Sequence, residues 1–262
     1  EYGNEIPSTQ AQLRVYTSQY LKPDSAHYNI PYAFKVNEVD IARLENAVNA
    51  LIARHESLRT RFETRNGQIM QIIEENASIK VQKLESEDIT AFNTPFELEK
   101  APLLRVGYFE NTIFFVIHHI IADGETMNII FRELNALYTE KTLPEAVQYG
   151  EFSVTDGYTQ ENEAYWLNVF EELPEAINLK TDSDRPEKKT FEGSEIYEIT
   201  DTHAKIEEFC KKQGITPYVY YMACLGILLS KLTGNEDIVI GTPMSGRESR
   251  YLDTVGMFVN TV

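Results

Sequence analysis

The sequence predicts an α/β protein built as two lobes. Segments rich in aromatic and β-branched residues, typical of strands, occur between segments whose apolar residues recur at helical spacing. The stretch 173–193 is polar, charged and without periodicity, which is typical of a linker. We therefore assign residues 1–175 to an N-terminal lobe, and residues 176–262 to a linker and the first part of a C-terminal lobe.

Composition narrows the class of protein. With 262 residues, 42% of them hydrophobic, the chain can bury a sizeable core. Its net charge of -17 disfavours nucleic acid and anionic membranes as partners, because binding phosphates requires clustered Lys and Arg. Cys210 and Cys224 fall in predicted helices without metal-type spacing, so we expect reduced, buried thiols in a cytoplasmic protein. The apolar stretch 218–229 is too short to span a bilayer and predicts a core helix.

The first part of the chain predicts a helix, a strand and a second helix. Ser8 is the expected N-cap of the first helix. A strand follows over residues 28–36, and Asp40 can cap a helix whose apolar positions extend to Ile52. Asn66-Gly67 predicts a tight turn between strands 58–65 and 68–74, since both residues tolerate positive φ angles.

The remaining segments alternate in the same way. They predict a weak strand at 79–84, paired strands at 103–109 and 112–118, helices at 127–138 and 162–172, a strand at 195–199, helices at 203–212 and 217–232, and strands at 237–241 and 255–262. The last strand would leave a small second lobe with an abrupt boundary, and the chain starts at Glu1 without a methionine. We therefore expect a fragment of a larger protein whose second lobe is incomplete.

Two adjacent histidines at the end of an apolar strand are the strongest candidates for chemistry. Side chains alternate along a strand, so at most one of His118 and His119 faces a cleft while the other packs beneath it. A neutral imidazole can accept a proton from an attacking amine or alcohol. A lone histidine is more often structural, and metal ligation is a weaker alternative because no further ligand lies at a recognisable spacing.

Asp123 and Gly124 follow the histidines at an expected helix start. A carboxylate there can accept hydrogen bonds from the helix N-terminus and pair with an arginine, which makes Asp123 a poor base. A second general base and a simple helix cap remain alternative roles. Gly124 would leave room for a sharp turn and for close approach of a substrate.

Several segments together resemble one family. Residues 117–124 contain HHxxxDG, the signature of condensation domains of nonribosomal peptide synthetases, in the chloramphenicol-acetyltransferase-like superfamily. Further segments are similar to other motifs of that family, in the same order: residues 8–16 to SxAQxRxY, 54–62 to RHExLRTxF, 149–154 to a looser fourth motif, 241–247 to GTPxxGR and 255–261 to VGxFVNT. The resemblance implies a two-lobe fold with mixed sheets and flanking helices, here without the last two motifs.

The resemblance also implies roles for individual residues. His119 matches the histidine at the reaction centre, as general base or as a positioning and charge-stabilising group, and His118 is then structural. Asp123 matches an aspartate that pairs with an arginine, for which Arg247 is the best match. The remaining matches are Arg54 and Arg59, which would shape the core near the site, and Asn260, near the active centre.

The implied reaction is amide formation between a donor acyl or peptidyl thioester and an aminoacyl acceptor. Both substrates would arrive on phosphopantetheine arms of carrier domains, next to an adenylation domain, and the domain itself would bind no metal or cofactor. An epimerisation domain, a CoA-dependent acyltransferase of the same fold and a catalytically silent carrier-docking domain remain alternatives.

Overall fold

The computed structural model describes residues 2–155, 160–182, 184, 187 and 203–262. The chain divides into two compact units, one of Glu1–Thr159 with Pro243–Val262 and one of Gln160–Thr242. This differs from the predicted boundary at residue 175. The C-terminal segment belongs to the first unit because its apolar residues, including Val255 and Met257, are buried in that unit's core.

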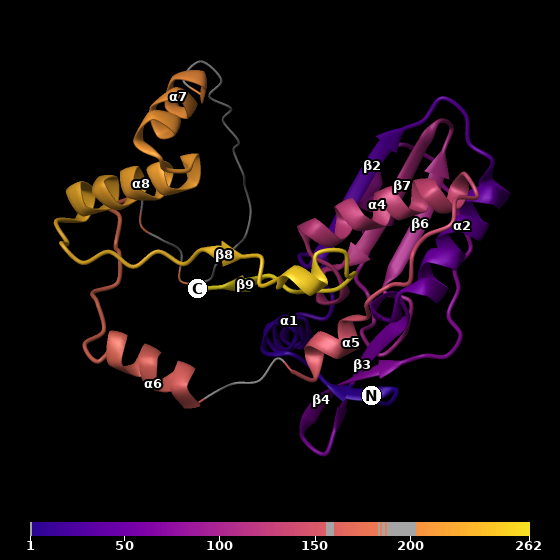
Figure 1. Ribbon diagram of the computed structural model, residues 1–262, viewed down its shortest axis with the longest axis horizontal. Coiled ribbons are helices and arrows are strands. Elements are labelled where there is room, and N and C mark those ends of the chain that lie inside the picture. Colours follow the sequence, from indigo (N-terminus) through magenta and orange to yellow (C-terminus); the bar gives the residue numbers. More distant parts are fainter. Residues whose placement is uncertain (1, 156–159, 183, 185–186, 188–202) are drawn as a thin grey trace. The chain divides into compact units, whose positions relative to one another are not determined.

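The first unit holds the described strands and the helices of residues 1–159 (Figure 1). In chain order they are β1 (Glu5–Pro7), α1 (Gln10–Leu21), β2 (Asn29–Lys35), α2 (Ile41–Arg54), the 3-10 turn η1 (Glu56–Arg59), β3 (Thr60–Arg65), β4 (Gln68–Ile73), β5 (Gln82–Lys83), α3 (Ile89–Phe92), β6 (Leu104–Phe109), β7 (Thr112–His118), the 3-10 turn η2 (His119–Ile121), α4 (Gly124–Tyr138), α5 (Tyr149–Ser153), β8 (Pro243–Met244), the 3-10 turn η3 (Ser249–Tyr251) and β9 (Asn260–Thr261).

The main sheet has the order β2-β7-β6-β5. Strand β5 runs parallel to β6 and the other pairs are antiparallel, so the expected mixed sheet is confirmed. A second sheet, β1-β4-β3, contains the predicted hairpin, in which Asn66 and Gly67 have φ angles of 53° and 79°. The weak strand expected at 79–84 is reduced to β5.

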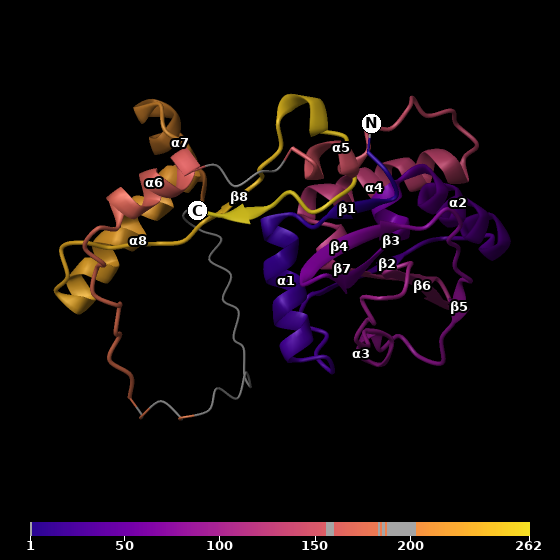
Figure 2. The same ribbon diagram turned by 90° about the horizontal axis from the view of Figure 1, so that it is seen from below.

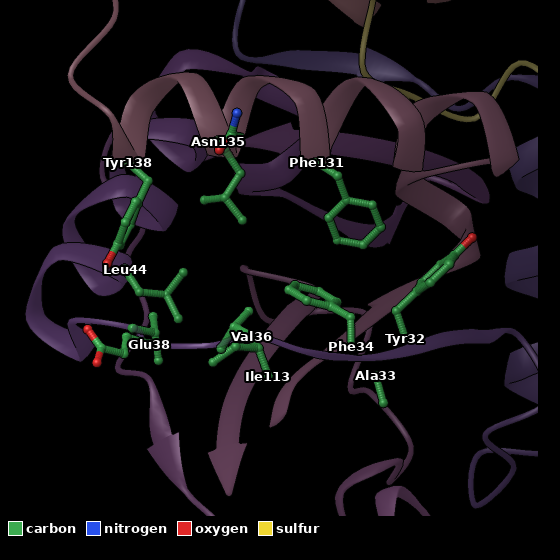
Figure 3. A pocket seen from close by; sticks show the side chains of 12 residues that line it. Tyr32, Ala33, Phe34, Val36, Glu38, Leu44, Ile113, Phe131, Asn135 and Tyr138 are labelled. Carbon is green, nitrogen blue, oxygen red and sulfur yellow. The ribbon is translucent and has the colours of Figure 1, made fainter. Parts of the chain in front are cut away.

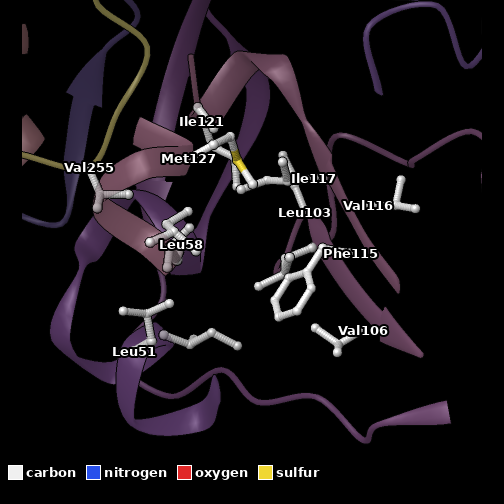
Figure 4. Packing of buried hydrophobic residues seen from close by; sticks show 14 of the residues in the cluster. Leu51, Leu58, Leu103, Val106, Phe115, Val116, Ile117, Ile121, Met127 and Val255 are labelled. Atoms are coloured by element: carbon white, nitrogen blue, oxygen red, sulfur yellow. The ribbon is translucent and has the colours of Figure 1, made fainter. Parts of the chain in front are cut away.

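Helices α2 and α4 cover one face of the main sheet (Figure 2). The rings of Phe34 and Phe115, from β2 and β7, both meet Phe131 of α4 edge to face, at centroid distances of 5.5 Å. All of β7 is buried, and Leu51 and Leu58 join its side chains in one apolar cluster (Figure 4). This core fixes the strand that ends at the histidines.

Helix caps follow the predicted chemistry with one shift. Asp40 caps α2 as expected, accepting a hydrogen bond from the Arg43 amide. The N-cap of α1 is Thr9 and not Ser8, because Thr9 forms a reciprocal capping box with Gln12. Residues 255–259 lie outside any strand, so the predicted final strand is limited to β9.

The second unit contributes α6 (Gln160–Val169), α7 (His203–Gln213) and α8 (Pro217–Thr233). The two helices predicted after residue 203 are confirmed. No residue of α8 is buried among the described residues, so the prediction that residues 218–229 form a core helix is wrong. The described part of this unit contains helices and no sheet against which α8 could be buried. Both cysteines are free, but only Cys210 is buried and Cys224 is exposed.

Of the two strands predicted for this unit, only the one at 237–241 falls on described residues. Residues 237–241 form no strand, because no described segment pairs with them. The strand predicted at 195–199 lies outside the described residues. Among the helices that the structure describes, none alone is long and apolar enough to cross a bilayer; α7 and α8 reach that limit only as a pair with a 103° bend.

Candidate active site

The two histidines lie at the junction of β7 and η2, which is held by backbone hydrogen bonds on both sides. The His118 amide donates to the carbonyl of Leu103 at 2.9 Å, and the His119 amide donates to the carbonyl of Tyr28 at 2.7 Å. The strand therefore presents both side chains from a fixed backbone, at the point where the chain turns toward α4.

His118 is a buried, neutral group. Its side chain is fully buried, its Nδ1 accepts a hydrogen bond from the Ile120 amide at 3.2 Å, and its ring meets Phe96 edge to face. Burial, with smaller effects of His119 and His27, lowers the pKa of His118 to about 3. His118 thus occupies the packed position that the sequence predicted.

His119 is only partly buried and begins η2. Its ring meets Tyr28 edge to face, with 6.5 Å between centroids. Its Nδ1 is buried and has no hydrogen-bond partner among the described residues. Among the described residues, the ring is therefore oriented by packing and by its backbone, with no carboxylate bonded to Nδ1.

Asp123 is fully engaged as a helix cap and as one half of a buried ion pair. Its Oδ1 accepts hydrogen bonds from the Thr126 amide and from Arg247 Nη2, both at 2.8 Å, and its Oδ2 accepts one from the Phe258 amide at 3.0 Å. The predicted pair with Arg247 is confirmed, with side-chain exposures of only 5% and 2%. Three donors occupy the two carboxylate oxygens, which favours a structural role.

Arg247 is also satisfied by the loop that follows it. Its Nη1 donates to the carbonyls of Tyr251 and Thr254 at 3.0 and 2.6 Å, and its guanidinium lies over the Phe258 ring at 4.1 Å. Both terminal nitrogens of the guanidinium are hydrogen-bonded, whereas the buried Nε has no partner among the described residues. A buried charge is tolerated when it is paired and hydrogen-bonded. The ion pair therefore ties the start of α4 to the C-terminal segment.

Thr126 is a member of this cluster that sequence reasoning missed. Its buried hydroxyl donates to the carbonyl of Gly256 at 2.6 Å and accepts hydrogen bonds from Arg247 Nη2 and the Gly256 amide, at 2.8 and 3.0 Å. Nothing local marks Thr126, since its partners lie far along the chain. Thr126 reaches its partners only because residues 254–258 pack on α4.

Arg54 and Arg59 contact residues outside the histidine segment. Arg54 pairs with Glu133 of α4 at 2.9 Å and donates to the carbonyl of Pro144 at 2.5 Å. Arg59 donates to the carbonyl of Glu74 at 2.5 Å. These contacts join α2 to α4 and η1 to the end of β4, which is a role in the surrounding core.

Gly124 and Asn260 make few side-chain contacts. Gly124 is the first residue of α4, its φ is not positive, and a Cβ there would meet no atom within 4 Å. The turn into α4 therefore does not need the positive φ that glycine tolerates, and the backbone at Gly124 is open to approach. Asn260, in β9, is exposed and accepts a hydrogen bond from Arg14 of α1.

A separate apolar pocket of about 520 Å³ opens between β2, the start of α2 and the last turns of α4 (Figure 3). Its walls include Phe34, Leu44, Phe131 and Tyr138. The pocket reaches β7 at Ile113, six residues before His119. At about 3.3 Å per residue this is roughly 20 Å along the strand, so the pocket is not part of the histidine site.

Comparison with known proteins agrees with the motifs. A family model described as "Condensation domain" matches residues 2–262. The chain is 39% identical over 276 residues to bacitracin synthase 3 of Bacillus licheniformis, covering 97% of this chain and 4% of that protein. It is 36% identical over 278 residues to gramicidin S synthase 2 of Brevibacillus brevis, covering 98% and 6%. The chain thus spans a small part of the curated relatives it matches.

Solved structures share the fold. A four-domain nonribosomal peptide synthetase bound to AMP and glycine matches with a TM-score of 0.84 and 23% identity, over 100% of this chain and 22% of that one. The condensation domain from Monacolin K polyketide synthase matches with a TM-score of 0.81 and 22% identity, over 98% and 66%. At 22–23% identity, these matches show that the chain shares the fold of the two structures.

Proposed function

Because the chain belongs to the condensation-domain family, we propose that it contributes the histidine side of a site for amide-bond formation. In the proposed reaction, the amine of an aminoacyl thioester attacks the carbonyl of an acyl or peptidyl thioester. The amide bond forms, the donor thiol leaves, and the attacking nitrogen loses a proton.

One observation supports this proposal most directly: the adjacent histidines have opposite surroundings. His118 is buried and neutral, Asp123 is committed to Arg247 and helix α4, and His119 is the partly exposed ring of the segment. His119 is therefore the group that could accept or relay the proton of the attacking amine. The open backbone at Gly124 would allow a substrate to approach the same turn.

Two physical effects would supply the rate. Holding amine and thioester in attacking geometry can lower the barrier by about 7–11 kcal/mol. A positioned general base adds about 10²–10⁴-fold. If His119 instead stabilises charge or orients the amine, it would act from the same position, so both roles depend on where its ring is held.

The proposal includes the delivery of substrates. Donor and acceptor would be carried on phosphopantetheine arms of upstream and downstream carrier domains, with an adenylation domain loading the acceptor. The domain would need no resident cofactor. Its free thiols, Cys210 and Cys224, suit a reducing compartment, and we expect it to act in the cytoplasm.

The test uses the condensation domain with separately loaded donor and acceptor carrier proteins, and mass spectrometry of the carrier-bound product. His119→Ala should reduce product formation by about 10²–10⁴-fold while carrier loading is unchanged. His203→Ala is the matched control, since His203 lies on α7 with a side chain 59% exposed. Full product yield from His119→Ala would refute the assignment.

The same assay separates the alternatives. Acylation of a free amine from an acyl-CoA, without carriers, would favour a CoA-dependent acyltransferase. Exchange of the α-proton of a carrier-bound aminoacyl group with deuterated solvent would favour an epimerisation domain. Carrier binding without any product, in the unaltered protein, would favour a silent docking domain.

A further inference from the structure

The side chain of Gln12 connects helix α1 to the turn that carries His119. As part of the capping box of α1, its Oε1 accepts a hydrogen bond from the Thr9 amide at 3.0 Å. Its Nε2 donates to the carbonyl of Ile120 at 3.2 Å and to Gln71 Oε1 at 2.9 Å. The side chain is 1% exposed, so both amide hydrogens are used inside the protein.

The carbonyl of Ile120 belongs to the residue next to His119 in η2. The amide of Ile120 is already bonded to His118 Nδ1, and the amide of His119 to the Tyr28 carbonyl. Gln12 adds a hydrogen bond on the carbonyl side of the turn. The backbone on both sides of the His119 ring is therefore restrained, although no described residue hydrogen-bonds to its Nδ1.

Gln71 determines how the Gln12 amide is oriented. Its Nε2 donates to the carbonyl of Pro7 at 3.0 Å and to Ser153 Oγ at 2.7 Å, which leaves its oxygen facing Gln12. With this acceptor on one side and the Ile120 carbonyl on the other, the Gln12 amide has one arrangement that satisfies all its partners. The restraint on η2 is thus built into a buried network.

We propose that Gln12 is a positioning residue for His119. Without its amide, the Ile120 carbonyl loses a buried partner, the peptide plane of η2 can rotate, and the His119 ring shifts relative to the substrates. This inference rests on the proposed function of His119. A displacement of about 1 Å at a reacting group can cost about 10²-fold in rate.

Gln12→Met tests the proposal, because methionine has similar length and no amide hydrogens. The matched control is Gln19→Met: Gln19 is on the same helix, is 4% exposed, and donates to the carbonyls of Lys22, Pro23 and Ser25 at 3.4, 3.2 and 3.0 Å. We expect both variants to lower Tm, but only Gln12→Met to lower kcat, by about 10- to 100-fold with KM little changed.

A second variant separates the capping role from the positioning role. Gln12→Glu keeps an oxygen to accept from the Thr9 amide, but its buried carboxyl has at most one hydrogen, whereas the amide donates one each to the Ile120 carbonyl and to Gln71 Oε1. It should therefore retain the helix cap and still lose kcat. If Gln12→Met fails to fold, this variant carries the test.

Carbon-proton NMR of the histidine rings gives a readout independent of turnover. The His119 resonances should move in both Gln12 variants and stay in place in Gln19→Met. Unchanged kcat and His119 resonances in the Gln12 variants, or an equal loss of kcat in Gln19→Met, would overturn the proposal. If His119→Ala remains active while the Gln12 variants move the His119 resonances, the proposed function fails and the positioning contact stands.

Discussion

At the scale of single residues, neighbouring side chains of the same type have different chemistry because their burial differs. The ring of His118 is enclosed by the core and accepts a hydrogen bond from the Ile120 amide, whereas that of His119 is partly exposed. Desolvation disfavours the charged form of a buried imidazole. His118 therefore contributes packing, and the proposed proton transfer is assigned to His119.

Acid should destabilise the protein through His118. Its folded-state pKa is about 3, against about 6.5 when unfolded, so below pH 6.5 only the unfolded chain binds a proton there. Stability from this group is complete above pH 6.5 and falls toward pH 3, by up to about 1.4 kcal/mol per pH unit. Urea unfolding at pH 7 and pH 5 should show about 2 kcal/mol of this loss.

His118→Asn provides the comparison for this prediction. Its side-chain oxygen can accept from the Ile120 amide as Nδ1 does, but it does not titrate. The variant should lose less stability than the natural chain between pH 7 and pH 5, and His203→Asn should behave like the natural chain. Parallel stability curves for all three proteins would contradict the assigned shift.

At the scale of elements, the site depends on where helices begin. Asp123 caps α4 and Thr9 caps α1, and both caps also bind groups outside their own helix. The Thr9 hydroxyl lies 3.3 Å from Tyr149 Oη, which donates to the carbonyl of Met257 at 2.7 Å. Helix ends thus connect the histidine turn to the C-terminal segment.

The shift of the α1 cap from Ser8 to Thr9 can be measured. Thr9→Ala should lower the free energy of unfolding by about 0.5–2 kcal/mol, because the first turn of α1 loses its capping oxygen. Ser8→Ala should cost much less, since Ser8 Oγ is buried without a hydrogen-bond partner in the described residues. Urea titrations decide between them, with Thr9→Ser expected to retain most of the stability. An equal or larger loss in Ser8→Ala would assign the cap to Ser8.

At the scale of the whole molecule, the C-terminal segment completes the first unit. Val255 and Met257 enter its core, and Arg247 reaches Asp123 across more than a hundred residues. The Phe258 amide bonds the same carboxylate. The environment of the histidine segment therefore depends on residues that the linear order of the chain places in another lobe.

Removing the charge of Asp123 should loosen this attachment. Asp123→Asn leaves the Arg247 guanidinium buried without its counterion, which typically destabilises a protein by about 3–5 kcal/mol. Asp253→Asn is the control: Asp253 pairs with Arg132 at the surface with 77% of its side chain exposed, so little change is expected. Urea unfolding measures both. An Asp123→Asn variant of normal stability but slow condensation would instead assign Asp123 a direct part in the chemistry.

Elements coded by neighbouring residues were predicted well. The Asn66-Gly67 turn, the Asp40 cap and the pairing of the strands around residues 110–111 each depend on a few adjacent side chains. Prediction failed at 237–241, where an apolar stretch lacks a described partner strand. A strand is stable only with neighbours, and periodicity does not reveal them.

The amino-acid sequence by itself determined the order of most elements, the adjacent histidines before an Asp-Gly helix start, and the motifs that indicated the family and the Arg247 partner. The tertiary structure decided which histidine is enclosed, which donors hold Asp123, and that Gln12 and Thr126 contact the site. These contacts join segments more than a hundred residues apart. Local patterns set helices and strands, whereas burial and long-range hydrogen bonds arise only when those elements pack together.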